Sequence, residues 1–336
     1  MKDLAKKMII FGSVGLLLYA AGMVMVPGVL MANFNSTDWF FGKIYGELSS
    51  GPCPDILVLG SSHAYRSFDP RVAETNGVRL SNLASPLQTP LNSYFLLDAF
   101  LRERSRIGAC IPRAIAIELY EKTLRDEGLE SFTKTLDDRP LELADALHGI
   151  AIRDPLAMHM LVARIGERVF GTGTNSAKLR PFEMYVQGGF ISTVTERKRP
   201  SDGKSAESAT VRAEIVACSR NPQSCVPSER QLDYLQRTMR LIRSAGAIPV
   251  LVVAPMPSDV EARNPYLGSA NAAIRSLAEK NGASLISDFS KAELDDYSDF
   301  SDGTHLNNTG AEKVTGEFIR RLLLIPGYGS APESSS

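Results

Sequence analysis

Short apolar runs alternate with longer amphipathic stretches over much of the chain, which is the pattern of a parallel sheet covered by helices. The first run, DILVLG at 55–60, has the length and flanks of a buried strand and ends at Gly60, before Ser61 and Ser62. Four later runs predict further strands: VRLSNLA (78–84), AIAIEL (114–119), AIPVLVVAP (247–255) and ASLISDF (283–289). The pattern therefore predicts a five-stranded parallel sheet.

Helices are predicted between these strands by a 3.6-residue apolar period at 91–105, 229–246 and 269–282, with a final amphipathic helix before the tail. The expected fold is flavodoxin-like, a three-layer α/β/α domain formed by residues 33–120 and 229–326. In such sheets, ligands bind at the carboxyl ends of the strands. The turn after the first strand, with its two serines, lies at that edge.

The alternation stops for about a hundred residues, from 121 to 228. A loop of that length without structure is unusual in a compact domain, so this stretch is interpreted as an inserted subdomain or lid, largely helical and loop. The last residues, 327–336, are expected to form a disordered tail.

The amino terminus combines a basic start, MKDLAKK, with an uncharged apolar run from about Met8 to Met31. This run is long enough to cross a bilayer, which needs about 20 apolar residues. A cleaved signal peptide is the alternative, but its apolar region is shorter and is followed by a small-residue cleavage site. We expect residues 1–32 to be a transmembrane anchor in the lipid bilayer, with a cytoplasmic N-terminus and the body in the periplasm or another extracytoplasmic space.

The charge balance argues against one class of function. With 37 Lys and Arg against 38 Asp and Glu, the formal net charge is -1, so the chain lacks the basic field of a nucleic-acid-binding protein. The four histidines include no HExxH or clustered Cys/His spacing. No cofactor or metal is therefore expected, and His148 and His159 are interpreted as packing or surface residues of the insert.

The four cysteines are an even number, as in proteins of oxidising compartments. Cys218 and Cys225 bound a short polar stretch, and Cys53 and Cys110 each precede a predicted strand of the same sheet. These positions predict the disulfides 53 with 110 and 218 with 225. Four free buried thiols are the alternative.

Ser62 can be either the cap of a following helix or a nucleophile, and alone it favours the cap. Asp302 and His305 add to it, because they stand three residues apart in a loop after the last predicted strand. At that spacing the carboxylate can hold one imidazole nitrogen while the other points toward the strand edge. The three side chains together form a candidate Ser-His-Asp site.

Gly60-Ser61-Ser62 after the first strand and Asp302-Gly303-Thr304-His305 before the last helix resemble the motifs of the SGNH or GDSL hydrolase family. The resemblance covers about 55–120 and 230–325. It implies that Ser62 is the nucleophile, that its amide is one oxyanion donor, that His305 is the base and that Asp302 orients it.

Two positions depart from the family pattern. The usual glycine after the second strand is replaced by a stretch in which Ser85 is the candidate donor and Pro86 has no N–H. The usual Gly-x-Asn-Asp after the third strand is replaced by Glu118-Leu119-Tyr120-Glu121, so the asparagine side-chain donor is missing. Loss of one such donor can lower the rate about 10²-fold to 10³-fold.

Three further residues near the edge are candidates for oxyanion or substrate binding. His63 follows the nucleophile, Arg66 could bind a carboxylate or phosphate, and Tyr120 ends a strand at the same edge. Each has a structural alternative: a solvent-facing helix start for His63, an ion pair with Asp69 for Arg66, and a structural hydrogen bond for Tyr120.

The combination of a GSS turn, an N-terminal anchor and a long insert resembles the membrane-anchored SGNH-like proteins of cell-surface acylation, of the alginate O-acetyltransferase and D-alanyl-lipoteichoic acid assembly types. This resemblance implies an extracytoplasmic serine O-acyltransferase, transferring usually acetyl to a carbohydrate acceptor beside a membrane-bound O-acyltransferase partner. An esterase or deacetylase and a non-catalytic binding partner of such an enzyme are the alternatives.

Overall fold

A computed structural model describes residues 52–125 except 86, 107 and 109, residues 183–198, residues 216, 218 and 220, and residues 225–328. All of these residues belong to one compact unit. The predicted anchor at 1–32, most of the 121–228 insert and the tail beyond 328 lie outside the described residues. Within the described ranges, no helix is both long enough and apolar enough to span a bilayer.

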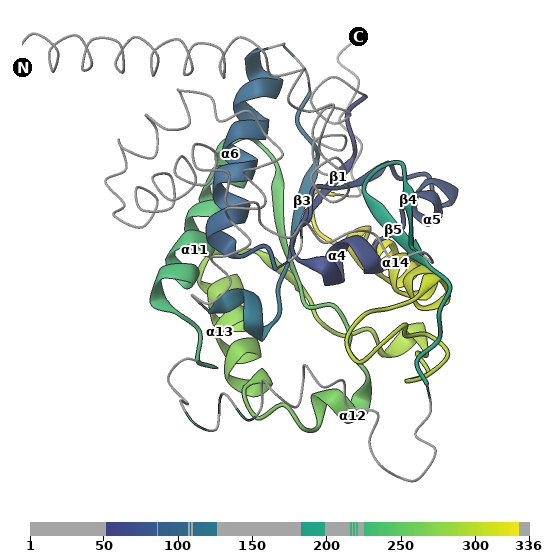
Figure 1. Ribbon diagram of the computed structural model, residues 1–336. Coiled ribbons are helices and arrows are strands. Elements are labelled where there is room, and N and C mark those ends of the chain that lie inside the picture. Colours follow the sequence, from purple (N-terminus) through teal and green to yellow (C-terminus); the bar gives the residue numbers. More distant parts are fainter. Residues whose placement is uncertain are drawn as a thin grey trace, which may run out of the picture. The chain divides into compact units, whose positions relative to one another are not determined.

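Five parallel strands form the central sheet (Figure 1), as the alternating pattern predicts. Their order is β2-β1-β3-β6-β7, which is the flavodoxin-like order. The bounds are Ile56–Leu59 for β1, Leu80–Asn82 for β2, Ala114–Glu118 for β3, Ile248–Val252 for β6 and Ser284–Ile286 for β7. The predicted runs are longer than the strands because they extend into the loops at the strand ends.

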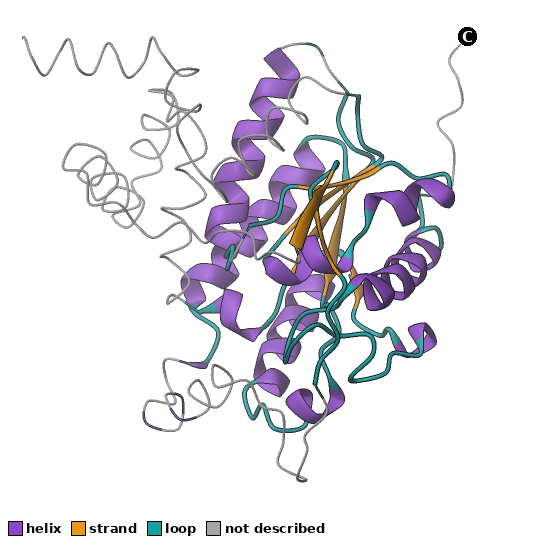
Figure 2. Cartoon of the chain, turned by 45° about the vertical axis from the view of Figure 1, so that its right-hand side comes forward, coloured by secondary structure: helices purple, strands orange, loops and turns teal. Residues whose placement is uncertain are grey.

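Helices cover both faces of the sheet (Figure 2). On one face lie α6 (Pro90–Arg106), α11 (Glu229–Ser244) and α13 (Leu267–Lys280). On the other lie α4 (Ser62–Ser67), α5 (Pro70–Thr75) and α14 (Asn308–Leu322). The short α12 (Ser258–Glu261), η1 (Glu121–Leu124) and η4 (Ser290–Ala292) lie in connections between these elements.

The core lies on both sides of β1 and β3, where every residue of both strands is buried. Ile56 pairs with Leu80 on one side and with Ala114 on the other. Strands buried on both faces appear in sequence as continuous apolar runs, which is why DILVLG and AIAIEL are recognisable. The first strand therefore brings the serine turn to the centre of the sheet edge.

A β-hairpin in the second half of the insert is absent from the predicted elements. Strand β4 (Glu183–Val186) pairs antiparallel with β5 (Phe190–Thr193). The turn packs on the end of β2, where the Gly188 carbonyl accepts the Asn82 N–H at 2.7 Å. A Cβ at Gly189 would lie 2.2 Å from the Asn82 carbonyl oxygen, so the close approach requires glycine. This part of the insert is integrated into the body.

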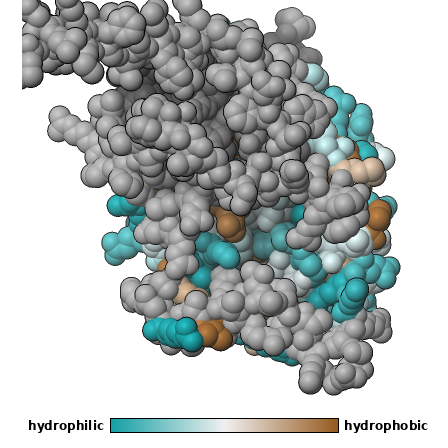
Figure 3. Space-filling view, viewed as in Figure 1, coloured by the Kyte–Doolittle hydropathy of each residue, from teal (hydrophilic) through white to brown (hydrophobic). Residues whose placement is uncertain are grey.

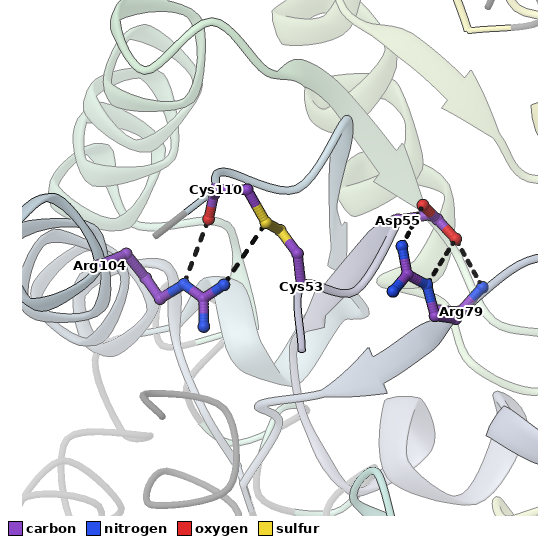
Figure 4. The surroundings of a disulfide bond; sticks show 5 residues. All are labelled: Cys53, Asp55, Arg79, Arg104 and Cys110. Atoms are coloured by element: carbon purple, nitrogen blue, oxygen red, sulfur yellow. Dashed lines mark hydrogen bonds and ion pairs between the residues drawn. A yellow bond between two sulfur atoms is a disulfide. The ribbon is translucent and has the colours of Figure 1, made fainter. Parts of the chain in front are cut away.

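Both predicted disulfides are present, Cys53 with Cys110 and Cys218 with Cys225. The first joins the segments that precede β1 and β3, and Arg104 binds the Cys110 carbonyl and sulfur beside it (Figure 4). This bridge lies at the amino-terminal edge of the sheet, opposite the serine turn.

The described surface in Figure 3 is mainly hydrophilic, with isolated apolar residues. Among the described residues, the exposed large hydrophobic side chains are Met184, Val194, Val216, Leu323 and Leu324.

Candidate active site

The turn after β1 is held against the end of β3. Gly60 has φ +144°, and a Cβ on it would lie 2.7 Å from Cβ of Glu118. Ser61 is the N-cap of α4, because its hydroxyl accepts the His63 N–H at 3.1 Å. The capping role considered for Ser62 therefore belongs to its neighbour, and the Ser62 side chain makes a different contact.

A chain of hydrogen bonds connects Ser62, His305 and Asp302. Ser62 Oγ lies 2.8 Å from His305 Nε2, and His305 Nδ1 lies 2.9 Å from Asp302 Oδ2. The Asp302 carboxylate also accepts the backbone N–H groups of Thr304 and His305, at 2.9 Å each. These bonds fix the imidazole with one nitrogen on the carboxylate and the other on the hydroxyl, the geometry that base-assisted attack by a serine requires.

The pKa values of His305 and Asp302 are both lower than usual, and in each group burial and pairing act in opposite directions. Burial lowers the pKa of His305, and the nearby His63 and Arg66 lower it further, against the raising effect of Asp302. Burial raises the pKa of the Asp302 carboxyl, but the hydrogen bond and charge of His305 and the two amides outweigh it and hold that pKa below its usual value. At neutral pH the imidazole is therefore free to accept a proton.

Glu118, at the end of β3, is fully buried beneath the turn. Its Oε2 accepts both the N–H and the hydroxyl of Ser61, at 2.8 Å each. Its other oxygen, Oε1, lies 3.7 Å from Nδ1 of His63. Glu118 reaches this edge because it ends β3, and its contacts with the serine turn depend on the pairing of β1 with β3.

The candidates His63 and Tyr120 are brought together with the hydrogen-bonded chain. The His63 ring centroid lies 4.3 Å from that of Tyr120 and 5.1 Å from that of His305. His63 is only 4 % exposed, so it is not the solvent-facing residue considered as its alternative. Arg66 is buried in the last turn of α4 and is close enough to influence His305 electrostatically.

Ser85 is placed differently from the expectation. Its N–H donates to the Gly60 carbonyl at 3.0 Å, and its hydroxyl donates to Oε1 of Gln88 at 3.0 Å. Both donors are thus engaged in holding the loop after β2 against the serine turn, so Ser85 as placed here offers no oxyanion donor. The Ser62 amide begins α4, and no described residue accepts a hydrogen bond from it.

The loop that carries Asp302 and His305 is fastened by the segment 183–198, which the sequence reasoning did not connect to the site. Asn308 binds the Ser192 hydroxyl and accepts the Thr193 N–H at 2.8 Å. Arg197 donates its N–H to the Phe300 carbonyl at 2.7 Å and binds the Asp259 carboxylate through two nitrogens, at 2.7 and 2.8 Å. Both ends of the loop Phe300–Asn308 are therefore attached to this segment.

A separate cavity of about 570 Å³ lies beyond the ends of β6 and β7. Glu261, Asn271, Arg275, Phe289 and Phe300 are among its lining residues, whereas Ser62 and His305 are not. In the part of the chain that the structure describes, no group of three or more His, Cys, Asp or Glu side chains could hold a metal ion.

A hydrogen-bonded serine, histidine and aspartate at the carboxyl edge of a parallel sheet is an arrangement used for acyl transfer on several unrelated folds. No family model matches the sequence. No curated protein is significantly similar to it.

Solved structures with a similar chain path include a psychrotrophic esterase EstA from a Pseudoalteromonas species, in a form inhibited by monoethylphosphonate. It is 13% identical with a TM-score of 0.38, covering 80% of this chain and 98% of the esterase. A protein described as lipolytic, of the G-D-S-L family of Desulfitobacterium hafniense, is 11% identical with a TM-score of 0.36, covering 79% and 97%.

A protein described as an acylhydrolase from Bacteroides fragilis is 11% identical with a TM-score of 0.39, covering 84% of this chain and 92% of that chain. At such identities and TM-scores the likeness assigns no activity to this chain, and the function is argued from the site.

Proposed function

We propose that this chain is an SGNH-type serine acyltransferase or esterase that uses Ser62 as a covalent nucleophile. The observation that carries the proposal is the continuous hydrogen-bonded chain from Ser62 Oγ through His305 to Asp302. Its geometry is already that of an activated nucleophile, and the lowered pKa of His305 keeps the base unprotonated at neutral pH.

The reaction would proceed in two steps, acylation of Ser62 and then deacylation. Ser62 Oγ attacks the acyl carbonyl, its proton passes to His305 Nε2, and the carbonyl electron pair moves onto oxygen. When that electron pair re-forms the carbonyl, the bond from the acyl carbon to the leaving-group oxygen breaks, and His305 gives its proton to the leaving-group oxygen. The acyl-serine ester is then attacked by a hydroxyl of the acceptor or by water, with His305 again taking and returning the proton.

Transfer of an acetyl group to a cell-surface or secreted polysaccharide is the specific function we propose. The apolar run from Met8 to Met31 supports an anchored, extracytoplasmic location, where a carbohydrate acceptor and a membrane-bound O-acyltransferase partner would be within reach. Hydrolysis of an acyl ester uses the same acyl-serine with water as acceptor, so it is the alternative outcome of the same site.

Fluorophosphonate labelling of the full chain tests the nucleophile. We expect stoichiometric labelling of the wild type, none of Ser62→Ala, and normal labelling of the control Ser244→Ala, whose exposed hydroxyl binds the Leu241 carbonyl in α11. Labelling of Ser62→Ala at the wild-type rate would remove Ser62 from the mechanism.

Intact mass after incubation with p-nitrophenyl acetate tests the acyl intermediate and its fate. An added acetyl mass in the wild type and not in Ser62→Ala identifies the ester. Faster loss of this mass on addition of an oligosaccharide, with appearance of the acetylated sugar, indicates transfer, whereas loss at an unchanged rate indicates hydrolysis.

A purely binding role makes a different prediction. If Ser62→Ala, Asp302→Ala and His305→Ala each preserved the cellular phenotype while deletion of the insert abolished it, the chain would be a non-catalytic partner.

A further inference from the structure

His63 and Glu118 form a buried pair next to the proposed nucleophile. Their exposed fractions are 4 % and 0 %, and Nδ1 of His63 faces Oε1 of Glu118 at 3.7 Å. Within the described part of the chain, neither atom has a hydrogen-bond partner. Buried polar atoms are rarely left without partners, and an exception often marks a functional site.

Neither the loop after β2 nor the end of β3 offers an oxyanion donor among its described residues. Ser85 uses its N–H and its hydroxyl on other groups, and β3 ends in a glutamate whose Oε2 accepts from Ser61. That leaves the Ser62 amide. A single donor is a weak oxyanion site, because each donor contributes about 10²-fold to 10³-fold in rate.

His63 is placed to supply the missing donor. It directly follows Ser62 in α4, and its ring centroid lies 5.1 Å from that of His305, the ring that binds the Ser62 hydroxyl. Since Nδ1 faces Glu118, the opposite nitrogen, Nε2, points away from the buried carboxylate. The packing of the ring against Tyr120 at 4.3 Å restricts its rotation.

The pair can hold Nε2 as a donor. An imidazole nitrogen donates only when it carries a proton, so the donor form has one proton on Nε2 and a second on Nδ1 or on Glu118. In this form the buried pair has no net charge, which avoids the cost of an unpaired buried carboxylate.

We propose that His63, held in orientation by Glu118, donates a hydrogen bond from Nε2 to the oxyanion that forms on attack by Ser62. His63 is then a catalytic residue and Glu118 a positioning residue. The pair replaces the asparagine donor whose motif is absent after β3. This inference rests on the proposed function, because it requires the acyl-serine chemistry at Ser62.

Two substitutions of similar length separate hydrogen bonding from packing. His63→Met fills the space without an N–H, and His63→Gln keeps an N–H near the place of Nε2. In p-nitrophenyl acetate turnover by the full chain, we expect His63→Met to lower kcat about 10²-fold or more with KM nearly unchanged. The kcat of His63→Gln should be at least about tenfold higher than that of His63→Met.

Coupling to Glu118 is tested by a double-mutant cycle. Glu118→Gln should lower kcat by a larger factor in the wild-type background than in His63→Met, because the part of its effect that acts through the imidazole is absent in His63→Met, whereas its contact with Ser61 is common to both. Additive effects of the two substitutions would show that Glu118 does not position His63. An acylation kcat of His63→Met within about threefold of the wild type, or equal losses in His63→Met and His63→Gln, would overturn the donor role.

A measurement on the wild type covers the case in which His63→Met does not fold. Fluorophosphonate places an oxygen of its tetrahedral adduct at the oxyanion position, so we expect a histidine Nε2–H resonance that becomes protected from exchange on labelling and is absent in His63→Gln. No such resonance would overturn the proposal. Failure of Ser62 to label in the wild type would instead overturn the proposed function.

Discussion

The turn Gly60–Ser67 and the loop Phe300–Asn308 meet at the hydrogen bond between Ser62 and His305, but they are positioned by different contacts. The turn continues a buried strand and rests on Glu118 of the adjacent strand. The loop follows the last strand and is attached by Arg197 and Thr193, which come from the hairpin and the segment after it.

The two halves of the site should therefore respond differently to substitution. The position of Ser62 depends on core packing, so disturbing it should destabilise the whole domain. The position of His305 depends on a loop that is anchored by buried Phe300 and Leu306 and is also attached by polar contacts at its ends, so removing one of those polar contacts should affect catalysis more than stability.

The largest expected effect is on the orienting acid. Asp302→Asn removes the negative charge that holds His305 Nδ1–H, so the imidazole loses its tautomer and its stabilisation when protonated. We expect kcat for ester turnover to fall about 10²-fold to 10⁴-fold with little change in unfolding free energy. A matched thermal melt of both proteins checks the second point. A fall of less than tenfold would mean that Asp302 does not orient the base.

A smaller effect on activity but a large one on stability is expected at the packed turn. Gly60→Ala adds a Cβ only 2.7 Å from Glu118 Cβ at φ +144°, and we expect a loss of about 3 kcal/mol in unfolding free energy by urea denaturation. Gly77→Ala is the control, because Gly77 also has positive φ, +71°, but has nothing within 4 Å of the added Cβ. That variant should lose only about 1 kcal/mol. Equal losses would show that the contact with Glu118 is unimportant.

A smaller effect is expected at the loop attachment. Asn308→Ala leaves the Thr193 N–H without its acceptor, which costs about 1–3 kcal/mol if that amide remains buried. If the segment 183–198 positions the loop, kcat should also fall, by up to about 10²-fold for a 1 Å displacement of His305. Arg102→Ala is the control, since Arg102 has an exposed side chain on α6 and its ion pair is with Asp98 of the same helix. An Asn308→Ala enzyme with unchanged kcat would separate the segment from catalysis.

The smallest effect concerns pH. Protonated His305 cannot accept the Ser62 proton, so the acylation rate should fall as pH decreases, with a midpoint below the usual histidine value of about 6.5 because burial lowers the pKa of His305. His63 also lowers that pKa, so His63→Gln should move the midpoint upward. A pH profile of kcat/KM for both proteins measures the shift. A wild-type midpoint above about 7 would contradict the environment described for His305.

Much of the fold could be predicted because its strands are buried on both faces and appear as continuous apolar runs. The order of the five strands and both disulfides agree with the predictions. The hairpin at 183–193 was not predicted, since it pairs with no strand of the central sheet and lies within the stretch 121–228, where the alternating sequence pattern stops.

Part of the site was also visible in the sequence. Spacing alone indicated that Asp302 could hold His305, because residues three apart in a loop can contact each other without help from the rest of the chain. The placement of Ser85 was not visible, since whether its N–H is engaged depends on the approach of the loop after β2 to Gly60.

The sequence by itself determined the local elements: the strand that ends at Gly60, the serines after it, and the aspartate and histidine three residues apart. These follow from chain connectivity and apolar periodicity, which act over a few residues. Only the tertiary structure decided that Glu118 lies beneath the turn facing His63, and that Asn308 and Arg197 attach the loop of His305 to the hairpin segment. Those contacts join residues far apart in the chain, and the packing of buried strands and loops brings them together.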